Sequence, residues 1–447
     1  MALTLAPPVR RPTRYMTYRH FLAHAHLLPA VAAVLLLAAP VAPGDVTASG
    51  KVTPADAASA VLVLTCAVQL VRNRRRVLSG VAAMVLGAPV VGFAVAAVTS
   101  ADPGAGWTGF LRYVQVFVLV PAALVLLLRD RRDFAVVAGA VVVLALVQGG
   151  LGVWQYAASE GASYQGRNIR AVGTFGPSDV MGMATAVAYG LVVAAGYALA
   201  PGRARVRAVA GACAVALLVP LTVSFSRGTW IATAVAVTAL IVSAGRRQAV
   251  RVLGVLAACA VLLVDGAGVG SQLIGARVAS IVQVADAPDS SVSDRYTLWA
   301  AALSMGREHP VTGVGLKRFR DERDAHASLA LDSGSDTAGA GQAFAREPLL
   351  SPHNMYLLVL SEQGLPGCAL LTGSWAALLV TGVRRLRDAR ARVPAAVGPG
   401  LAAVGLLLWQ GVDFLYSDIG GPSTVLTAVL LGLTAWWALH SADERAR

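Results

Sequence analysis

Apolar residues occur in long runs along most of the chain, and short polar stretches separate the runs. Most runs have about 17 to 25 residues, the length at which a helix crosses the hydrocarbon core of a bilayer. There are twelve, at about 22–42, 55–71, 77–99, 108–128, 134–157, 179–200, 206–223, 229–245, 249–266, 353–381, 398–416 and 422–440 of the 447 residues. The pattern predicts an all-α integral membrane protein with about twelve transmembrane helices, in which residues 1–447 form a single membrane domain.

The run 353–381 is longer than one crossing needs. Its 29 residues would extend about 43 Å as a helix at 1.5 Å per residue. The sequence "GLPG" at 364–367 contains residues that kink or break helices. We therefore expect residues 353–363 to form a separate short helix that holds His353 near the membrane interface.

The distribution of charge predicts the topology. The chain is 56% hydrophobic and 14% charged, with a formal net charge of +13. Of the 37 basic residues, 24 fall in alternate connections and at the two ends. Because basic residues concentrate on the cytoplasmic side, both termini are predicted to be cytoplasmic. The net positive charge is explained by the basic residues on the cytoplasmic side. We therefore expect the lipid bilayer as a partner and no nucleic acid.

One predicted extracytoplasmic connection is long. Residues 267–352, between the ninth and tenth runs, span 86 positions in a chain whose other turns are short. Long ordered loops are usually functional, so chemistry is expected here. Within it, "SVSDRYTLWAAALSMGREHP" predicts an amphipathic helix that begins at Ser293 or Asp294 and ends before Pro310, with its apolar residues at Tyr296, Trp299, Ala300 and Leu303. We expect this helix to lie on the membrane surface or to pack over the spans.

Two further segments of this connection have distinct compositions. The glycines of "VTGVGLKRF", residues 311–319, predict a tight turn. The stretch 331–342, "LDSGSDTAGAGQ", predicts a mobile loop or lid.

His353 is the candidate catalytic base. Only His309, His326 and His353 fall in the predicted extracytoplasmic part, and His353 opens an apolar helix. Partial burial at a helix start favours the neutral imidazole, which can accept a proton from an attacking hydroxyl. The alternative is an interfacial histidine that only caps the helix.

The predicted extracytoplasmic arginines are candidate anion ligands. In "TVSFSRGTW", Arg227 occupies a very short turn beside the hydroxyls of Ser224 and Ser226, and guanidinium groups bind phosphate bidentately. Arg295 in "SDRYTLW" is a second candidate, and "YQGRNIRAVGTFGPSD" adds Arg167 and Arg170. Several such arginines at one cavity would form a pyrophosphate site. Each alone can also be a solvated charge or can extend toward lipid headgroups.

Few carboxylates lie near the predicted spans. They are Asp179, Glu362, Asp413 and Asp418. Glu362 follows His353 by nine residues, which on a continuous helix places it on the opposite side, so we do not pair the two. Asp413 is a candidate for orienting a catalytic group or binding a sugar hydroxyl, and packing is the alternative. The four cysteines form no CxxC pair and no cluster with histidine, so we predict no metal site and no cofactor.

Three segments resemble one known family in their order and spacing. "SFSRGTW", "DRYTLWAAALSMGREHPVTGVGLKRF" and "PHNMYLLVLSEQGLPG" are similar to the signature regions of the O-antigen ligase and polymerase family of bacterial membrane glycosyltransferases. "AVGTFGPSDVMGMA" also resembles a family segment, although Ser178 and Asp179 stand where an asparagine is usual. The resemblance covers about residues 165 to 440.

The resemblance implies a GT-C-like, all-helical membrane fold and a specific reaction. Such proteins transfer a glycan from a polyprenyl-pyrophosphate carrier to an acceptor hydroxyl at the outer face of the bacterial cytoplasmic membrane, without a metal ion. On this comparison Arg227 and Arg295 would bind the pyrophosphate and His353 would activate the acceptor, while Asn354 and Glu362 match motif positions. The acceptor is left open as a glycan, a lipid or a cell-wall polymer.

Two alternatives to a ligase remain at this stage. A polysaccharide polymerase of the same superfamily has the same motifs and differs in its acceptor. A flippase or transporter of lipid-linked glycans also commonly has twelve spans. Transporters place polar residues at the membrane midplane, whereas the candidates here cluster at the predicted outer face, which favours the transferase.

Overall fold

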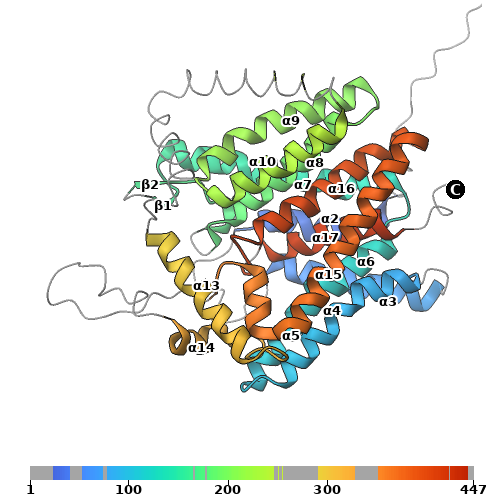
Figure 1. Cartoon of the computed structure of the whole chain (residues 1–447). Coiled ribbons are helices and arrows are strands. Elements are labelled where there is room, and N and C mark those ends of the chain that lie inside the picture. Colours follow the sequence, from blue (N-terminus) through green and yellow to red (C-terminus); the bar gives the residue numbers. More distant parts are fainter. Residues whose placement is uncertain are drawn as a thin grey trace, which may run out of the picture.

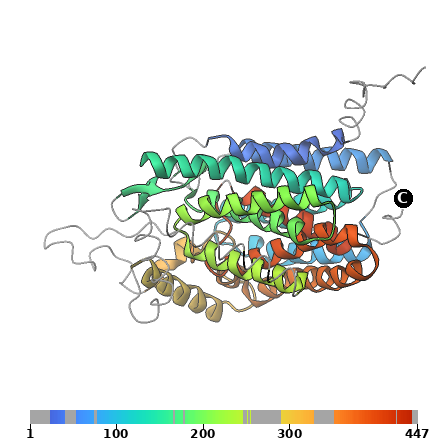
Figure 2. The same ribbon diagram turned by 90° about the horizontal axis from the view of Figure 1, so that it is seen from above.

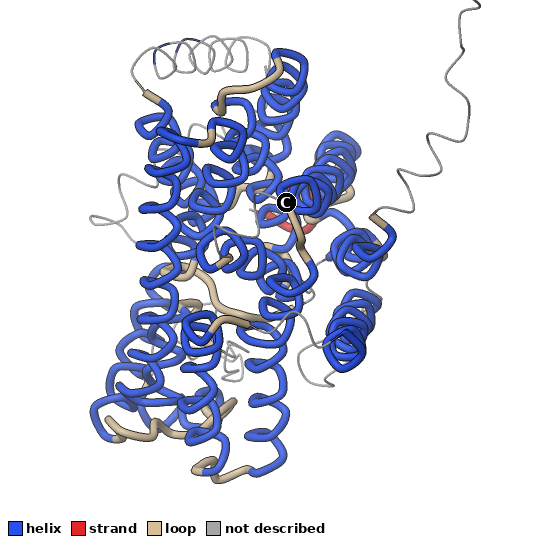
Figure 3. The backbone as a smooth tube through the Cα atoms, turned by 90° about the vertical axis from the view of Figure 1, so that its right-hand side faces the viewer, coloured by secondary structure: helices blue, strands red, loops and turns tan. Residues whose placement is uncertain are grey.

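The structure is a computed structural model that describes residues 24–40, 53–73, 78–164, 167–176, 179–245, 290–327, 351–421 and 423–440, with the single positions 250 and 254. Helices account for most of these residues, turns connect the helices, and the described strands form one short antiparallel hairpin (Figure 3). The long helices run side by side as a bundle, and the hairpin lies at one end of it together with the helices drawn in yellow and gold (Figure 2). We call this the hairpin end.

The elements follow one another along the chain as labelled in Figure 1. They are α2 (Leu28–Leu35), α3 (Pro54–Asn73), α4 (Gly80–Val98), α5 (Pro103–Val114), α6 (Val120–Leu127), α7 (Arg131–Ala158), β1 (Ala162–Tyr164), β2 (Arg167–Arg170), α8 (Gly182–Leu199), α9 (Ala204–Val223), α10 (Arg227–Ala244), α13 (Ser290–Glu308), α14 (Phe319–His326), α15 (Met355–Arg392), α16 (Val397–Asp413) and α17 (Thr424–Leu439).

The helix lengths agree with a multi-pass membrane protein. In the described part of the chain, nine helical segments are long and apolar enough to cross a membrane, and two shorter apolar helices lie at Ala25–Ala38 and Thr424–Leu439. They coincide with eleven of the twelve predicted runs. The remaining run, 249–266, lies outside the described residues, as does the predicted lid at 331–342. The total of twelve spans therefore stays a prediction.

Helices α8 and α16 form the centre of the bundle. Inside the protein, 83% of α8 is buried, compared with 22% of α3 and of α9. A helix that is apolar on every side is expected in such a core. At Gly196 a Cβ atom would come within 2.8 Å of the backbone nitrogen of Ala402, so the two helices pack backbone to backbone. The turn that follows α16 is thus anchored to the most buried part of the protein.

Helix α15 is divided at the predicted position. Gly364 has φ 68° and ψ −172°, which separates residues 355–363 from the rest of the helix. Beyond this kink the helix continues to Arg392. The predicted run ends at 381, and the helix extends beyond it through the basic residues 384–392 because Arg, Leu and Ala are strong helix formers.

Helix α13 differs from its prediction in two respects. It begins at Ser290, so the expected N-cap at Ser293 or Asp294 is wrong. It also packs through a different face. The side chains buried against the bundle belong to Leu298, Ala301, Ala302 and Met305, whereas Tyr296 and Leu303 are exposed. The predicted apolar residues and the buried residues each form a stripe with helical spacing. Hydrophobicity does not decide between them, because an apolar stripe can face either lipid or protein.

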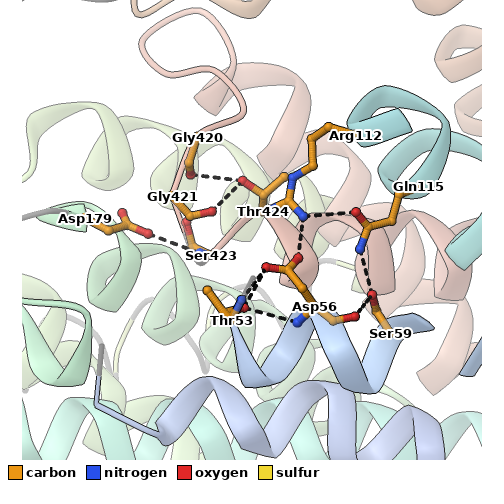
Figure 4. Close-up of polar contacts among 10 residues, drawn as sticks. All are labelled: Thr53, Asp56, Ser59, Arg112, Gln115, Asp179, Gly420, Gly421, Ser423 and Thr424. Atoms are coloured by element: carbon orange, nitrogen blue, oxygen red, sulfur yellow. Dashed lines mark hydrogen bonds and ion pairs between the residues drawn. The ribbon is translucent and has the colours of Figure 1, made fainter. Parts of the chain in front are cut away.

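A polar network joins α3 to α5 near the first residues of α17 (Figure 4). Arg112 forms an ion pair with Asp56 and donates to Oε1 of Gln115 at 3.1 Å. Gln115 in turn donates to the hydroxyl of Ser59 at 2.7 Å, and Thr53 donates to Asp56 at 2.7 Å. The first π-helical residue after α5 is Gln115. The network therefore supplies hydrogen-bond and ion-pair partners to Arg112 and Asp56, two charged residues that are energetically costly to bury unpaired at membrane depth.

Replacing Arg112 with methionine is expected to destabilise the protein by about 2 kcal/mol. This is less than the roughly 3–5 kcal/mol for a fully buried pair, because the Arg112 side chain is 27% exposed and that of Asp56 is 13% exposed. The measurement is thermal unfolding in detergent. The double variant Arg112→Met/Asp56→Leu should recover most of the loss, since no unpaired carboxylate is left. Equal losses in the single and double variants would contradict a stabilising role for the pair.

Candidate functional site

His353 lies immediately before α15 in a constrained backbone conformation. Its φ of 48° falls in the left-handed region, which residues other than glycine rarely adopt. Asn354 caps α15 with its side-chain oxygen, and its Nδ2 donates to the carbonyl of Leu415 at 3.2 Å. The N–H of Met355 donates to the carbonyl of Phe414 at 2.9 Å. The backbone of His353 is therefore held between α15 and the turn after α16.

Helix α13 lies on the other side of the same segment. The indole nitrogen of Trp299 donates to the carbonyl of Pro352 at 2.9 Å. One turn earlier on α13, Arg295 interacts electrostatically with His353. The structure thus brings together two of the predicted site residues that are 58 positions apart in the sequence.

Two aspartates complete this cluster. Asp413 ends α16, and Asp418 lies in the following turn; Arg295 interacts with both carboxylates. The hydroxyl of Ser417 donates to Asp413. Oδ1 of Asp413 and Oδ2 of Asp418 are covered and have no hydrogen-bond partner among the described residues. Buried polar atoms normally have such partners, so these two oxygens are unsatisfied acceptors in the described part of the chain.

The surroundings of His353 favour its neutral form. Burial lowers its pKa below the usual 6.5, the Asp418 carboxylate opposes this shift, and the positive charge of Arg295 adds to it. Burial also raises the pKa of Asp418, while His353 and the Ser351 hydroxyl favour its charged form. At neutral pH the imidazole can therefore accept a proton. The neighbouring carboxylate can stabilise the imidazolium that would form.

A second group of predicted residues meets at the turn between α9 and α10. The Nε of Arg170 donates to the carbonyl of Ser224 at 3.2 Å. Ser226 caps α10, whose first residue is Arg227, and its hydroxyl donates to Thr229 at 2.8 Å. Ser224 and Ser226 are buried and hydrogen-bonded within the turn, so they shape it. Arg227 occupies the positive end of the α10 helix dipole, where anions are favoured.

One packing contact connects this turn to the turn after α16, and one hydrogen bond connects the segment before α8 to the start of α17. A Cβ atom at Gly228 would lie 3.0 Å from the Cβ of Tyr416, so the start of α10 packs directly on the turn after α16. The carboxylate of Asp179 accepts from the backbone N–H of Ser423 at 3.1 Å (Figure 4). The turn at residues 414–421 therefore contacts both the start of α10 and the start of α15, which follows His353.

The remaining predicted residues lie elsewhere or are described only in part. Glu362 does not contact His353. It is 3% exposed and accepts from the backbone N–H of Phe319 at 3.3 Å. Arg167 begins β2 and pairs with Tyr164 in the hairpin, but its side chain lies outside the described residues. In the described part of the chain, no group of three histidine, cysteine, aspartate or glutamate side chains is arranged to hold a metal ion.

The sequence interpretation missed part of the site. Asp418 was noted among the carboxylates near the spans but was not assigned to the site, and Tyr416 and Ser351 were not considered. A sequence signal did exist, because Asp418 lies in the short predicted extracytoplasmic turn 417–421, five residues after Asp413. Its proximity to His353 depends on the contact between the start of α15 and the end of α16.

Comparison with known proteins gives one finding about the family. Residues 212–372 match the family model described as O-antigen ligase. No curated protein matches the chain. The matched region contains the α9–α10 turn with Arg227, helix α13 with Arg295, and His353 with the kinked part of α15. The match confirms, for residues 212–372, the resemblance to the O-antigen ligase family that was found in the sequence.

Proposed function

We propose that this protein is a membrane glycosyltransferase of the O-antigen ligase type. It transfers a glycan from a polyprenyl-pyrophosphate carrier to an acceptor hydroxyl on a glycan, a lipid or a cell-wall polymer. The observation that carries the proposal is the placement of Arg295 beside His353 and two carboxylates at the hairpin end. A cation and a neutral base at one site suit a reaction that expels an anion while deprotonating a nucleophile.

The proposed reaction is a single displacement at the anomeric carbon. His353 takes the proton of the acceptor hydroxyl as the acceptor oxygen bonds to that carbon. The bond from the carbon to the phosphate oxygen breaks, and its electron pair leaves with the carrier pyrophosphate. Since the base and the leaving group lie on opposite faces of the sugar, the anomeric configuration inverts.

Arginines stabilise the departing charge in this proposal. Arg295 and Arg227 bind the pyrophosphate, with Arg170 and Arg167 supporting them from the hairpin side. A guanidinium group fixed near a low-dielectric boundary stabilises developing negative charge strongly, which is why we propose that no metal ion is needed. Asp413 binds a sugar hydroxyl through Oδ1, which has no hydrogen-bond partner among the described residues, and Asn354 fixes the backbone of His353.

This function fits the cytoplasmic membrane of a bacterium, with both termini in the cytoplasm and the site on the opposite side. The basic connections predicted from the sequence support that orientation. A polymerase would use the same site with a growing glycan as its acceptor. A flippase would bind the same donor without breaking its phosphate bond.

The proposal is tested with purified protein in vesicles that contain a polyprenyl-pyrophosphate glycan and a glycan acceptor. We expect the glycan to become linked to the acceptor with inverted anomeric configuration, as measured by mass spectrometry and NMR. A free carrier pyrophosphate should appear in equal amount. Movement of intact donor between the leaflets, with no cleavage in the presence of acceptors of all three classes, would contradict the proposal and support a flippase.

A further inference from the structure

Helix α13 and the first segment of α15 form a parallel pair. Trp299 contacts Pro352 at the start of the pair. Further along, a Cβ atom at Gly306 would lie 3.0 Å from Cγ of Leu360. The C-terminal end of α13 and the end of residues 355–363 lie close together (Figure 1). Arg295 and His353 therefore lie at one end of the pair, and the kink at Gly364 lies at the other.

The far ends of the two helices are joined by backbone hydrogen bonds. We call this junction, formed by residues 310–319 and 361–365, the clasp. Its N–H groups at Val314 and Gly315 donate to the carbonyls of Ser361 and Glu362 at 2.9 and 3.1 Å. In the opposite direction, the N–H of Leu365 donates to the carbonyl of Pro310 at 2.7 Å. The clasp thus fixes the turn after α13 directly to the kink in α15.

Two glycines make this close approach possible. Gly313 and Gly364 both have positive φ, 66° and 68°. A Cβ atom at Gly313 would lie 2.2 Å from the carbonyl carbon of Glu362, and one at Gly364 would lie 2.7 Å from the carbonyl oxygen of Pro310. Each glycine therefore faces the backbone of the other segment, and no larger residue fits without opening the clasp.

Glu362 closes the clasp with its side chain. Its carboxylate accepts from the N–H of Phe319, the first residue of α14, at 3.3 Å, and interacts with the N–H of Lys317. Lys317 has φ 59°, a conformation that costs energy outside glycine. A buried carboxylate that accepts backbone N–H groups can hold this strained turn. No described hydrogen bond joins Glu362 to His353 or to another residue of the proposed catalytic cluster, and the Glu362 carboxylate interacts with that of Asp418 only electrostatically.

We propose that Glu362 is a positioning residue, and that the clasp sets the separation of Arg295 and His353. The inference rests on the proposed transferase function. The segment from Gly364 to Met355 is about 13 Å long at 1.5 Å per residue. A tilt of about 5° at the kink would move His353 by about 1 Å, a displacement that can reduce a rate about 100-fold.

The test combines a distance with a rate. Cysteines are introduced at the exposed positions Tyr296 and Leu415 of a chain whose native cysteines are replaced by alanine, and spin labels report the distance between α13 and the turn after α16. Transfer is measured separately in the unlabelled variants. For Glu362→Ala and Gly364→Ala, we expect a shifted or broadened distance distribution and a fall of about 100-fold in kcat, with donor KM changed less.

Two variants serve as controls. Glu362→Gln keeps an acceptor oxygen at the same position and should retain the wild-type distance, with kcat within about tenfold. Gly373→Ala lies on the same helix, where a Cβ atom meets nothing within 4 Å, and should leave both quantities unchanged. Thermal unfolding verifies that each variant is folded.

The outcomes separate this inference from the proposed function. A lower rate in Glu362→Ala with an unchanged distance would overturn the clasp, because Glu362 would then act in another way. A wild-type rate and distance in both Glu362→Ala and Gly364→Ala would overturn it too. If the distance changes as expected but the wild-type protein transfers no glycan, the clasp stands and the proposed function fails.

Discussion

Replacement of His353 by alanine is expected to lower the transfer rate by about 100- to 10,000-fold, the range for loss of a general base. Donor binding should change little, because the proposed pyrophosphate ligands are arginines. The helix should still form, since Asn354 supplies the cap of α15. The measurement is steady-state transfer in vesicles, together with donor binding by a competition assay.

The control for this prediction is His309→Ala. His309 follows the last residue of α13 and is exposed, and it lies at the clasp end of the helix pair. Its replacement should leave transfer unchanged. If His353→Ala retained full transfer, His353 would be only a residue at a helix start. If it abolished donor binding as well as transfer, its role would be in the donor site.

The membrane helices could be predicted because lipid imposes one dominant requirement. A helix must present about 20 apolar residues to cross the hydrocarbon core, so the apolar runs indicated the spans directly. The kink in α15 could also be predicted, since only glycine takes φ near 68° at low cost. The glycines at 313 and 315 predicted a tight turn for the same reason, and both have positive φ.

The packing face of α13 could not be predicted from hydrophobicity. Its two apolar stripes, one around Trp299 and one around Ala302, both have helical spacing. In a soluble protein water would penalise the exposed stripe, but near a bilayer lipid accepts it. Contacts with the bundle determine which stripe of α13 is buried, and they bury Leu298 and Met305.

The cluster around His353 was only partly accessible from the sequence. His353 and Arg295 stand in recognisable motifs, whereas Asp418 becomes a partner of His353 only through the fold. The N–H of Met355 donates to the carbonyls of Phe414 and Ser417, which brings the turn after α16 to the start of α15. Periodicity along one segment carries no information about such a contact, because it depends on how α15 and α16 pack.

Arg295→Met is expected to lower transfer about 100- to 1,000-fold, the range for loss of one group that stabilises developing negative charge. Arg295→Lys should not recover full activity, since an ammonium group cannot replace a bidentate guanidinium. The control is Arg307→Met, which removes an exposed arginine from the last turn of the same helix. Its transfer rate should equal that of the wild type.

The pH dependence tests whether Arg295 and His353 act at one site. Transfer needs neutral His353, so kcat/KM should fall as the pH drops through the His353 pKa, which lies below 6.5. Because the charge of Arg295 lowers this pKa, Arg295→Met should move the acidic limb of the profile to higher pH. Asp418 raises the same pKa, so Asp418→Asn should move the limb to lower pH. Shifts in opposite directions would support a shared site, whereas an unchanged limb in both variants would mean that the titrating base is not His353.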